Sequence, residues 1–246
     1  MKNSFIELNK KFLKIKEQGW IECKHKGDGS AGRLFEELIG NPENSFEIPD
    51  FKGIEIKTKY SKIEKFTTLF SYRPEGKYIL ESQRIKDTFG YPDKDFPSYN
   101  VLNACIYCNR FTHVNENYLF FPTIDKQKKK IILNIFDINL NLVENDINWD
   151  FDIIEEKVNR KIKYLAFINA DRKYEFGKVF YKFNNISFYK FKGIDSFLKQ
   201  FEKGNIRITF KLNIYKHGIK KGQIHDHGTS FDLRNTEINS VYELIK

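Results

Sequence analysis

The chain has 246 residues, a formal net charge of +9, 40% hydrophobic residues and 16% aromatic residues. This length and composition predict a folded globular protein, one large domain or two small lobes, and exclude a disordered chain. The sequence has no apolar run long enough to cross a bilayer and no apolar secretory signal near its N-terminus, so we expect a cytoplasmic protein without a membrane partner.

The basic charge favours a polyanionic partner such as nucleic acid, because each phosphate contact releases a counterion. Coding bias is an alternative explanation, since the chain is visibly rich in Lys, Asn, Ile and Phe, as AT-rich coding would produce. Charge by itself therefore leaves both explanations open.

The first hundred residues begin with two predicted helices. Ser4 and Glu7 suit a capping box that opens an amphipathic helix ending near Gly19. A glycine-bearing loop follows, and "RLFEELI" predicts a second helix closed by Gly40. Residues 60–100 carry turn signals and predict exposed loops with short strands between them.

Strands dominate the rest of the prediction. From residue 101 strand-like stretches recur, and the basic run between Ile124 and Ile131 suits a hairpin loop that aids solubility. Residues 194–203 predict a helix ending before Gly204. Two strands and a closing helix then follow, at 206–216, 229–234 and 240–245. The expected fold is mixed α/β, a central mixed sheet flanked by helices with a second, strand-rich lobe.

The three cysteines do not form a disulfide framework. Cys23-x-His25 and Cys105-x-x-Cys108 contain four candidate zinc ligands. However, "VLNACIYC" predicts a buried strand, in which residues three apart point to opposite faces. We therefore favour buried thiols over a zinc site.

The segment "PDFKGIEIKTK", residues 49–59, concentrates charge around two isoleucines. Apolar and polar residues alternate from Ile54 to Thr58, the pattern of a half-buried strand whose isoleucines face the core. The stretch "FEIP" predicts a partner strand, and the turn at 51–53 uses Gly53 at positive φ. This hairpin would return Asp50 to the side of Glu55.

Two explanations fit this charged patch. One is a solvated strand face on which Glu55 and Lys57 form an ion pair of little energetic value. The other is a Mg²⁺ site for phosphodiester hydrolysis, with oxygen ligands from Asp50, Glu55 and the backbone carbonyl of Ile56. Lys57 would then contact the scissile phosphate and the attacking water.

The stretch from Gly29 to Lys59 resembles the MutH family of DNA endonucleases, in its Gly-x-x-x-Leu-x-Glu helix, the following glycine, and "DF" before "GIEIKT". "PD" at 49–50 and "EIK" at 55–57 also match the PD-(D/E)xK nuclease superfamily. The C-terminal "GTSFDLRNTEINSVYELI" is similar to the closing strand and helix of the MutH family. Length, charge and motif placement resemble those of the MvaI/BcnI group of monomeric type II restriction enzymes. Residues 60–200 contain little that can be matched to this group.

This resemblance implies a PD-(D/E)xK nuclease core with Asp50 and Glu55 as metal ligands and Lys57 as the catalytic lysine. It also places an additional acidic residue at Glu36. The spacing of the residues agrees with a role for Glu36 at the active site. Gly29, Gly32, Glu36 and Gly40 lie on one helix face that has little side-chain bulk and can approach the hairpin closely. The alternative for Glu36 is an ordinary exposed glutamate between capping glycines.

Base recognition is predicted in the polar segment "KKGQIHDHGTSFDLR" and the strand before it. Arg, Lys and His donate to guanine O6 and N7, and Asp accepts from cytosine N4. The candidate readers of base edges are His225, Asp226, His227 and Arg234, with Arg207 and Lys211 as neighbours. "HDH" also suits a zinc or HNH-type site, for which an isolated His-x-His is a weak signal.

The expected protein is a Mg²⁺-dependent, sequence-specific endonuclease for double-stranded DNA that leaves 5′-phosphates. We expect Mn²⁺ to substitute for Mg²⁺, and Ca²⁺ to bind without supporting cleavage. Similarity to the MvaI/BcnI group implies a CC(A/T)GG-type target and a monomer that cuts the two strands in turn. A cognate DNA methyltransferase is implied as a genetic partner.

A close alternative is a strand-nicking repair enzyme like MutH, which would have the same site and chemistry and would differ only in its products. An alternative of another class is a DNA-binding protein without catalytic activity, which the intact Asp50, Glu55 and Lys57 disfavour. For domain organisation, we expect one nuclease domain, residues 1–246, with a catalytic lobe centred on 1–100 and a DNA-recognition lobe within 101–246.

Overall fold

The computed structural model describes residues 1–246 except 28, 41–47, 60–64, 227 and 246. The chain forms two compact units, each assembled from several segments. Unit 1 comprises Met1–Thr67, Lys157–Lys192 and Ile238–Lys246, and unit 2 comprises Thr68–Glu156 and Gly193–Glu237. Within the described ranges, no helix combines the length and apolar character needed to span a bilayer.

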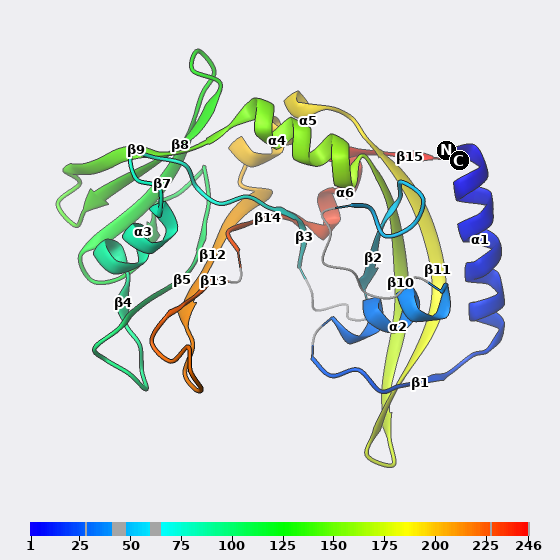
Figure 1. Ribbon diagram of the computed structural model, residues 1–246. Coiled ribbons are helices and arrows are strands. Elements are labelled where there is room, and N and C mark those ends of the chain that lie inside the picture. The colour runs from blue at the N-terminus through cyan, green and yellow to red at the C-terminus, as the bar shows by residue number, and fades with distance from the viewer. Residues whose placement is uncertain (28, 41–47, 60–64, 227, 246) are drawn as a thin grey trace. The chain divides into compact units, whose positions relative to one another are not determined.

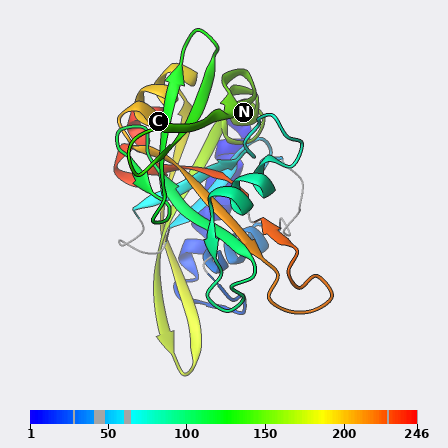
Figure 2. The same ribbon diagram turned by 90° about the vertical axis from the view of Figure 1, so that its left-hand side faces the viewer.

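Unit 1 is built on one mixed sheet (Figure 1). Its strands, in spatial order, are β1 (Ile21–Cys23), β11 (Lys178–Phe191), β10 (Tyr164–Glu175) and β2 (Glu55–Lys59), and β15 (Tyr242–Ile245) also pairs with β11. The β10–β2 pair is parallel and the other pairs are antiparallel. The turn of the long β10–β11 hairpin projects beyond the shorter strands of the unit (Figures 1 and 2).

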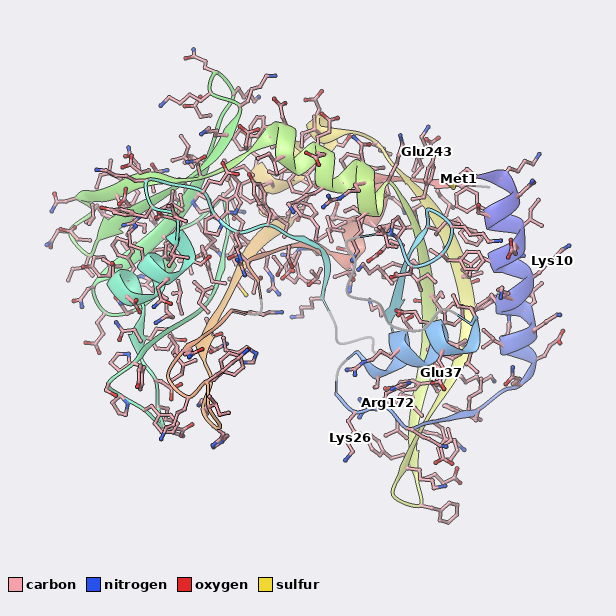
Figure 3. All side chains as sticks on the ribbon, in the orientation of Figure 1. Met1, Lys10, Lys26, Glu37, Arg172 and Glu243 are labelled. Atoms are coloured by element: carbon pink, nitrogen blue, oxygen red, sulfur yellow. The ribbon has the colours of Figure 1, made fainter. Side chains whose placement is uncertain are left out.

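Helices cover the sheet of unit 1. They are α1 (Lys2–Glu17), α2 (Ser30–Leu38), the π-helix η1 (Val158–Ile162) and α6 (Ile238–Val241). The predicted amphipathic character of α1 is confirmed, because α1 packs against β11 and buries Leu8, Phe12 and Ile15. Lys10 lies on its outer face (Figure 3). Helix α2 packs against β1 and β2 and buries Phe35, whose ring lies 5.2 Å from that of Phe183.

Unit 2 contains two sheets. The strands of the first, in order, are β3 (Phe66–Ser71), β14 (Ser230–Arg234), β12 (Ile206–Ile214), β5 (Asn100–Ile106) and β4 (Tyr91–Pro92), with β13 (Ile224–Asp226) paired to β12. The second consists of β6 (Thr112–His113), β7 (Tyr118–Asp125), β8 (Lys130–Asp137) and β9 (Leu142–Asp150). The helices are α3 (Glu81–Phe89), α4 (Phe151–Lys157), α5 (Ile194–Glu202) and the 3₁₀ helix η2 (Asn235–Glu237).

An aromatic core joins these layers of unit 2. The ring of Phe210 on β12 lies 6.2 Å from the rings of both Phe120 on β7 and Trp149 on β9. Phe231 on β14 contacts Phe197 and Trp149 at 5.8 and 6.0 Å. Each fully buried side chain of this kind contributes about 1.5–3 kcal/mol relative to an exposed one. The predicted α/β class, with a mixed central sheet, flanking helices and a strand-rich second part, is confirmed.

Three sequence-based predictions of local structure were wrong. Helix α1 begins at Lys2 with Met1 as its N-cap, so Ser4 lies inside the first turn and forms no cap. The region 60–100 contains the helix α3 as well as the expected strands and loops. The predicted closing helix is mostly strand β15, because residues 242–245 pair with β11 along Phe188–Phe191.

Candidate active site

A tight turn places the charged segment of unit 1. Phe51 and Ile54 exchange two backbone hydrogen bonds of 2.8 and 2.9 Å, and Lys52 and Gly53 occupy positive φ at 45° and 87°. Two consecutive residues in this conformation form a tight hairpin turn, which confirms the role predicted for Gly53. In the predicted partner strand, Ile48 and Pro49 are not in a strand, and residues 46–47 lie outside the described ranges.

The turn aims Asp50 at the backbone of β2. The N–H of Ile56 donates a hydrogen bond of 2.7 Å to Oδ2 of Asp50. The N–H and C=O of one strand residue point to the same side, and β2 is the last strand in the described sheet order. The carbonyl of Ile56 therefore also faces the outer edge of the sheet, on the side of Asp50.

Glu55 is a buried carboxylate. Only 2% of the residue is exposed, whereas Ile54 and Ile56 belong to the hydrophobic core of unit 1 as predicted. Its Oε1 accepts a hydrogen bond of 2.7 Å from Nζ of Lys57, and its Oε2 is buried without a hydrogen-bond partner among the described residues. Burial raises the pKa of Glu55 above its usual value, the charge of Lys57 opposes that rise, and the charge of Asp50 adds to it. The solvated-face explanation is therefore wrong for Glu55.

These groups have the chemistry of a site for a hard divalent cation. Asp50, Glu55 and the Ile56 carbonyl offer only oxygen atoms, and Mg²⁺ is commonly held by one or two carboxylates together with waters and phosphate oxygens. The buried, unpartnered Oε2 of Glu55 fits this use, because a buried acceptor is costly unless something binds it. The residues present therefore fit a Mg²⁺ ion.

The zinc alternatives gain no support. In the described part of the chain, no group of three or more His, Cys, Asp or Glu side chains is arranged to hold a metal ion. The cysteines are free thiols; Cys23 is buried, Cys105 and Cys108 are half-buried, and Sγ of Cys23 contacts the carbonyl of Ser30 at 3.6 Å. In the "HDH" segment, His227 lies outside the described residues.

Glu36 lies on the glycine-bearing face of α2, as the spacing predicts. A Cβ added at Gly32 would lie 3.8 Å from Oε1 of Glu36, so the two residues share one face. The helix packs against β2, and Gly40 at a φ of 79° follows its end. Glu36 is half-buried, and its role remains a prediction.

Sequence reasoning missed one cation at this site. Nζ of Lys161, on the π-helix η1, lies 3.7 Å from Oε1 of Glu55. Lys161 is more than a hundred residues from the motif, and no local pattern marks it. The hydroxyl of the buried Tyr242 donates a hydrogen bond of 3.3 Å to the carbonyl of Ile162, next to Lys161.

Strand β12 of unit 2 carries the predicted DNA-reading residues on one polar face. Its isoleucine, phenylalanine and leucine side chains alternate into the core, so Arg207 and Lys211 both lie on the opposite face. Nε of Arg207 donates to Oδ2 of Asp232 at 3.2 Å, and Nη1 donates to the Tyr107 hydroxyl at 3.4 Å. Lys211 is exposed.

His225 lies on β13 opposite Asn213 of β12, and thus on the same polar face. Its ring stacks on Tyr215 with centroids 4.1 Å apart. Asp226 is its neighbour on β13, and Arg234 is half-buried at the end of β14. Sequence reasoning did not single out three further polar residues of this face, Asp232, Asn103 and Asn213. Nδ2 of Asn103 donates a hydrogen bond of 2.8 Å to Oδ1 of Asn213.

Unit 1 combines a mixed sheet with two carboxylates and a lysine, and one sheet of unit 2 has a polar face that carries Arg207 and Lys211. This combination is typical of nucleases that cut DNA. The profile of the MvaI/BcnI restriction endonuclease family matches residues 9–242, and the chain belongs to that family. It is therefore a restriction endonuclease, a site-specific deoxyribonuclease with DNA as its partner, which confirms the family and the enzyme class predicted from the sequence.

Two solved structures are similar to the whole chain. One is the complex of restriction endonuclease MvaI with its cognate DNA substrate, with 30% identity, 97% of both chains covered and a TM-score of 0.88. The other is MvaI in the absence of DNA, with 29% identity, 100% of this chain and 98% of that chain covered, and a TM-score of 0.66. A search of curated proteins gave no match.

Proposed function

We propose that this restriction endonuclease hydrolyses phosphodiester bonds of double-stranded DNA with Mg²⁺ held by Asp50, Glu55 and the Ile56 carbonyl. The observation that carries this proposal is the buried Oε2 of Glu55, which has no hydrogen-bond partner among the described residues and belongs to the carboxylate bound by Lys57. The hydrogen bond from Ile56 to Asp50 supports it, because it places that carboxylate at the same edge of β2.

When bound, Mg²⁺ supplies positive charge that activates water and offsets charge on the reacting phosphate. Lys57 orients the attacking water and donates to a phosphate oxygen, and Glu36 supports the site from α2. Water adds to phosphorus and loses a proton, the bond from phosphorus to the 3′ oxygen breaks, and the 3′ oxygen takes up a proton, which gives a 5′-phosphate and a 3′-hydroxyl. Mn²⁺ replaces Mg²⁺ in this role, whereas Ca²⁺ binds without supporting cleavage.

We propose that unit 2 reads the DNA sequence. Its polar face carries Arg207, Lys211 and His225, which can donate to guanine O6 and N7. Asp226, His227 and Arg234 complete the proposed set of base-reading residues. A CC(A/T)GG-type target follows from the resemblance to the MvaI/BcnI group, and the solved MvaI–DNA complex supports DNA as the ligand of the whole chain.

The enzyme acts as a monomer in the cytoplasm and cuts the two strands one after the other. Each chain provides one Asp50–Glu55–Lys57 site, so one chain must meet the two strands in separate events. A cognate methyltransferase protects the host DNA at the same target. We propose that catalysis belongs to unit 1, which holds Asp50, Glu55 and Lys57 of the lobe predicted around 1–100, and that recognition belongs to unit 2, whose polar face lies within the predicted 101–246.

A plasmid assay tests the proposed chemistry. Supercoiled, unmethylated plasmid with one CC(A/T)GG site is incubated with the enzyme and Mg²⁺, and its three forms are followed over time. Parallel reactions use Lys57→Ala, no metal, and Lys52→Ala as a matched control, because Lys52 is an exposed lysine that pairs with Glu7.

Linear product through a transient open circle, seen with wild type and Lys52→Ala only, supports the proposal. Accumulation of open circle indicates a strand-nicking enzyme like MutH instead. Equal cleavage by Lys57→Ala, or without a divalent metal, would overturn the proposed chemistry.

A further inference from the structure

A second lysine lies at the buried carboxylate of Glu55. Nζ of Lys161 is 3.7 Å from Oε1 of Glu55, the oxygen that already accepts a hydrogen bond from Lys57 at 2.7 Å. The side chain of Lys161 is 33% exposed and that of Lys57 is 23% exposed, whereas that of Glu55 is 3% exposed. Both lysine side chains are therefore partly exposed to solvent, while their ammonium groups lie at one buried oxygen.

The fold holds Lys161 in this place through two features. Lys161 belongs to the π-helix η1, a rare conformation that is frequently found at functional sites. The π-helix runs into β10, where Leu165 lies directly opposite Glu55 in the parallel ladder. The Tyr242 hydroxyl holds the carbonyl of Ile162, the residue after Lys161.

Charge balance gives the second ammonium a role. The two carboxylates that would hold a divalent cation, Asp50 and Glu55, offset the charge of that cation, so the metal ligands do not compensate the charges of Lys57 and Lys161. A phosphodiester carries one negative charge, and addition of hydroxide to phosphorus raises this to two. One ammonium group matches the ground state, and the second matches the charge that develops during attack.

We propose that Lys161 is a second phosphate-binding cation of the active site, which leaves Glu55 and contacts a non-bridging oxygen of the scissile phosphate when DNA binds. This inference rests on the function proposed above for Asp50, Glu55 and Lys57. In the free protein Lys161 lies beside Glu55; a divalent cation held by Asp50 and Glu55 would neutralise that carboxylate in place of Lys161.

The test uses Lys161→Met, which keeps an unbranched apolar stem but removes the ammonium group, and Lys161→Arg, which keeps the positive charge. Lys163→Met is the matched control, because Lys163 is exposed and only two residues away. The first measurement is the single-turnover rate of cleavage in Mg²⁺. The second is the salt dependence of DNA binding in Ca²⁺, where each lost phosphate contact lowers the slope of log K against log salt by about 0.9.

We expect Lys161→Met to lower the cleavage rate by about 10- to 100-fold and the salt slope by about one unit. Lys161→Arg should retain most of both, and Lys163→Met should match wild type in rate. A wild-type rate for Lys161→Met would overturn the inference. A lower rate with an unchanged salt slope would also overturn it, because Lys161 would then act only through Glu55.

The experiments distinguish an error in the proposed function from an error in the role proposed for Lys161. If wild-type enzyme requires Mg²⁺ and Lys57, the proposed function stands whatever the Lys161 variants do. If wild-type enzyme does not cut with Mg²⁺, the salt slope still decides whether Lys161 contacts a phosphate. Thermal unfolding of each variant, compared with wild type, identifies any loss of rate that comes from a loss of folding.

Discussion

Tyr242 and Ile162 join the last strand of the chain to the π-helix at the active site. The Tyr242 hydroxyl donates a hydrogen bond of 3.3 Å to the Ile162 carbonyl, and Tyr242 is completely buried. Its burial, together with the nearby charge of Glu55, holds the pKa of the Tyr242 hydroxyl well above its usual value. The Tyr242 hydroxyl is therefore a neutral hydrogen-bond donor near the buried carboxylate of Glu55.

Tyr242→Phe should lower the free energy of unfolding by about 1–2 kcal/mol, because the ring still fills its space but the Ile162 carbonyl loses its donor. Urea unfolding followed by circular dichroism measures the change. Tyr189→Phe is the control, since Tyr189 is a half-buried tyrosine on the adjacent strand β11. Equal stability of Tyr242→Phe and Tyr189→Phe would contradict a role for the hydrogen bond.

Glu55→Gln should lower the cleavage rate by at least about 100-fold, because a neutral amide is a poor ligand for Mg²⁺. The same change should stabilise the metal-free fold at neutral pH. Burial raises the pKa of Glu55 in the folded state, so its favourable contribution is complete below the ordinary pKa of glutamate. That contribution is lost as the pH rises through the raised value.

Thermal unfolding from pH 4 to pH 8, without metal, checks this prediction. The advantage of Glu55→Gln should be absent at the acid end and should grow with pH. Added Mg²⁺ should raise the melting temperature of wild type but not that of the variant. A wild-type response of Glu55→Gln to Mg²⁺ would show that Glu55 is not a ligand.

Asp232→Ala should destabilise unit 2 by about 3–5 kcal/mol, since it removes a buried carboxylate that accepts hydrogen bonds from Arg207 and from three hydroxyl groups. Oδ1 of Asp232 accepts from Thr68 and Ser230 at 2.8 and 2.9 Å, and Oδ2 accepts from Thr209 and Arg207 at 2.6 and 3.2 Å. Urea unfolding measures the loss.

The exposed Asp146 on β9 supplies the control for this change. Asp146→Ala should alter stability by less than about 0.5 kcal/mol. The prediction fails if the two alanine variants unfold at the same urea concentration.

Cys108 should react slowly with alkylating reagents. Burial raises the pKa of its thiol to about 11, and the charge of Glu202 adds to the rise. At pH 7.5 we expect alkylation by iodoacetamide at least about ten times slower than in the urea-unfolded chain. Mass spectrometry of the Cys108 peptide follows the reaction, and equal rates in the two states would contradict the prediction.

Sequence-based prediction succeeded where the interactions are local. Asp50, Gly53, Glu55 and Lys57 lie within eight residues, and the positive φ of Gly53 together with strand alternation brings the carboxylates to one place. The polar face of β12 follows from the same two-residue period, which puts Arg207 and Lys211 on one side.

Sequence-based prediction failed where backbone hydrogen bonding outweighed the local conformational preference of a segment. Residues 242–245 suit a helix by their sequence, but the edge of β11 offers a ladder of hydrogen bonds to an adjacent strand. Ser4 suits a helix cap, but the N-cap lies three residues earlier, at Met1, whose carbonyl accepts a hydrogen bond from the N–H of Phe5.

The sequence by itself thus determined the nuclease motif and the family, because both depend on residue types at short spacings. Tertiary structure decided which distant groups join that motif. Lys161 reaches Glu55 because β10 pairs in parallel with β2, and Asp232 meets Arg207 because β14 pairs with β12. Contacts between distant residues depend on strand register and core packing, which no local pattern encodes.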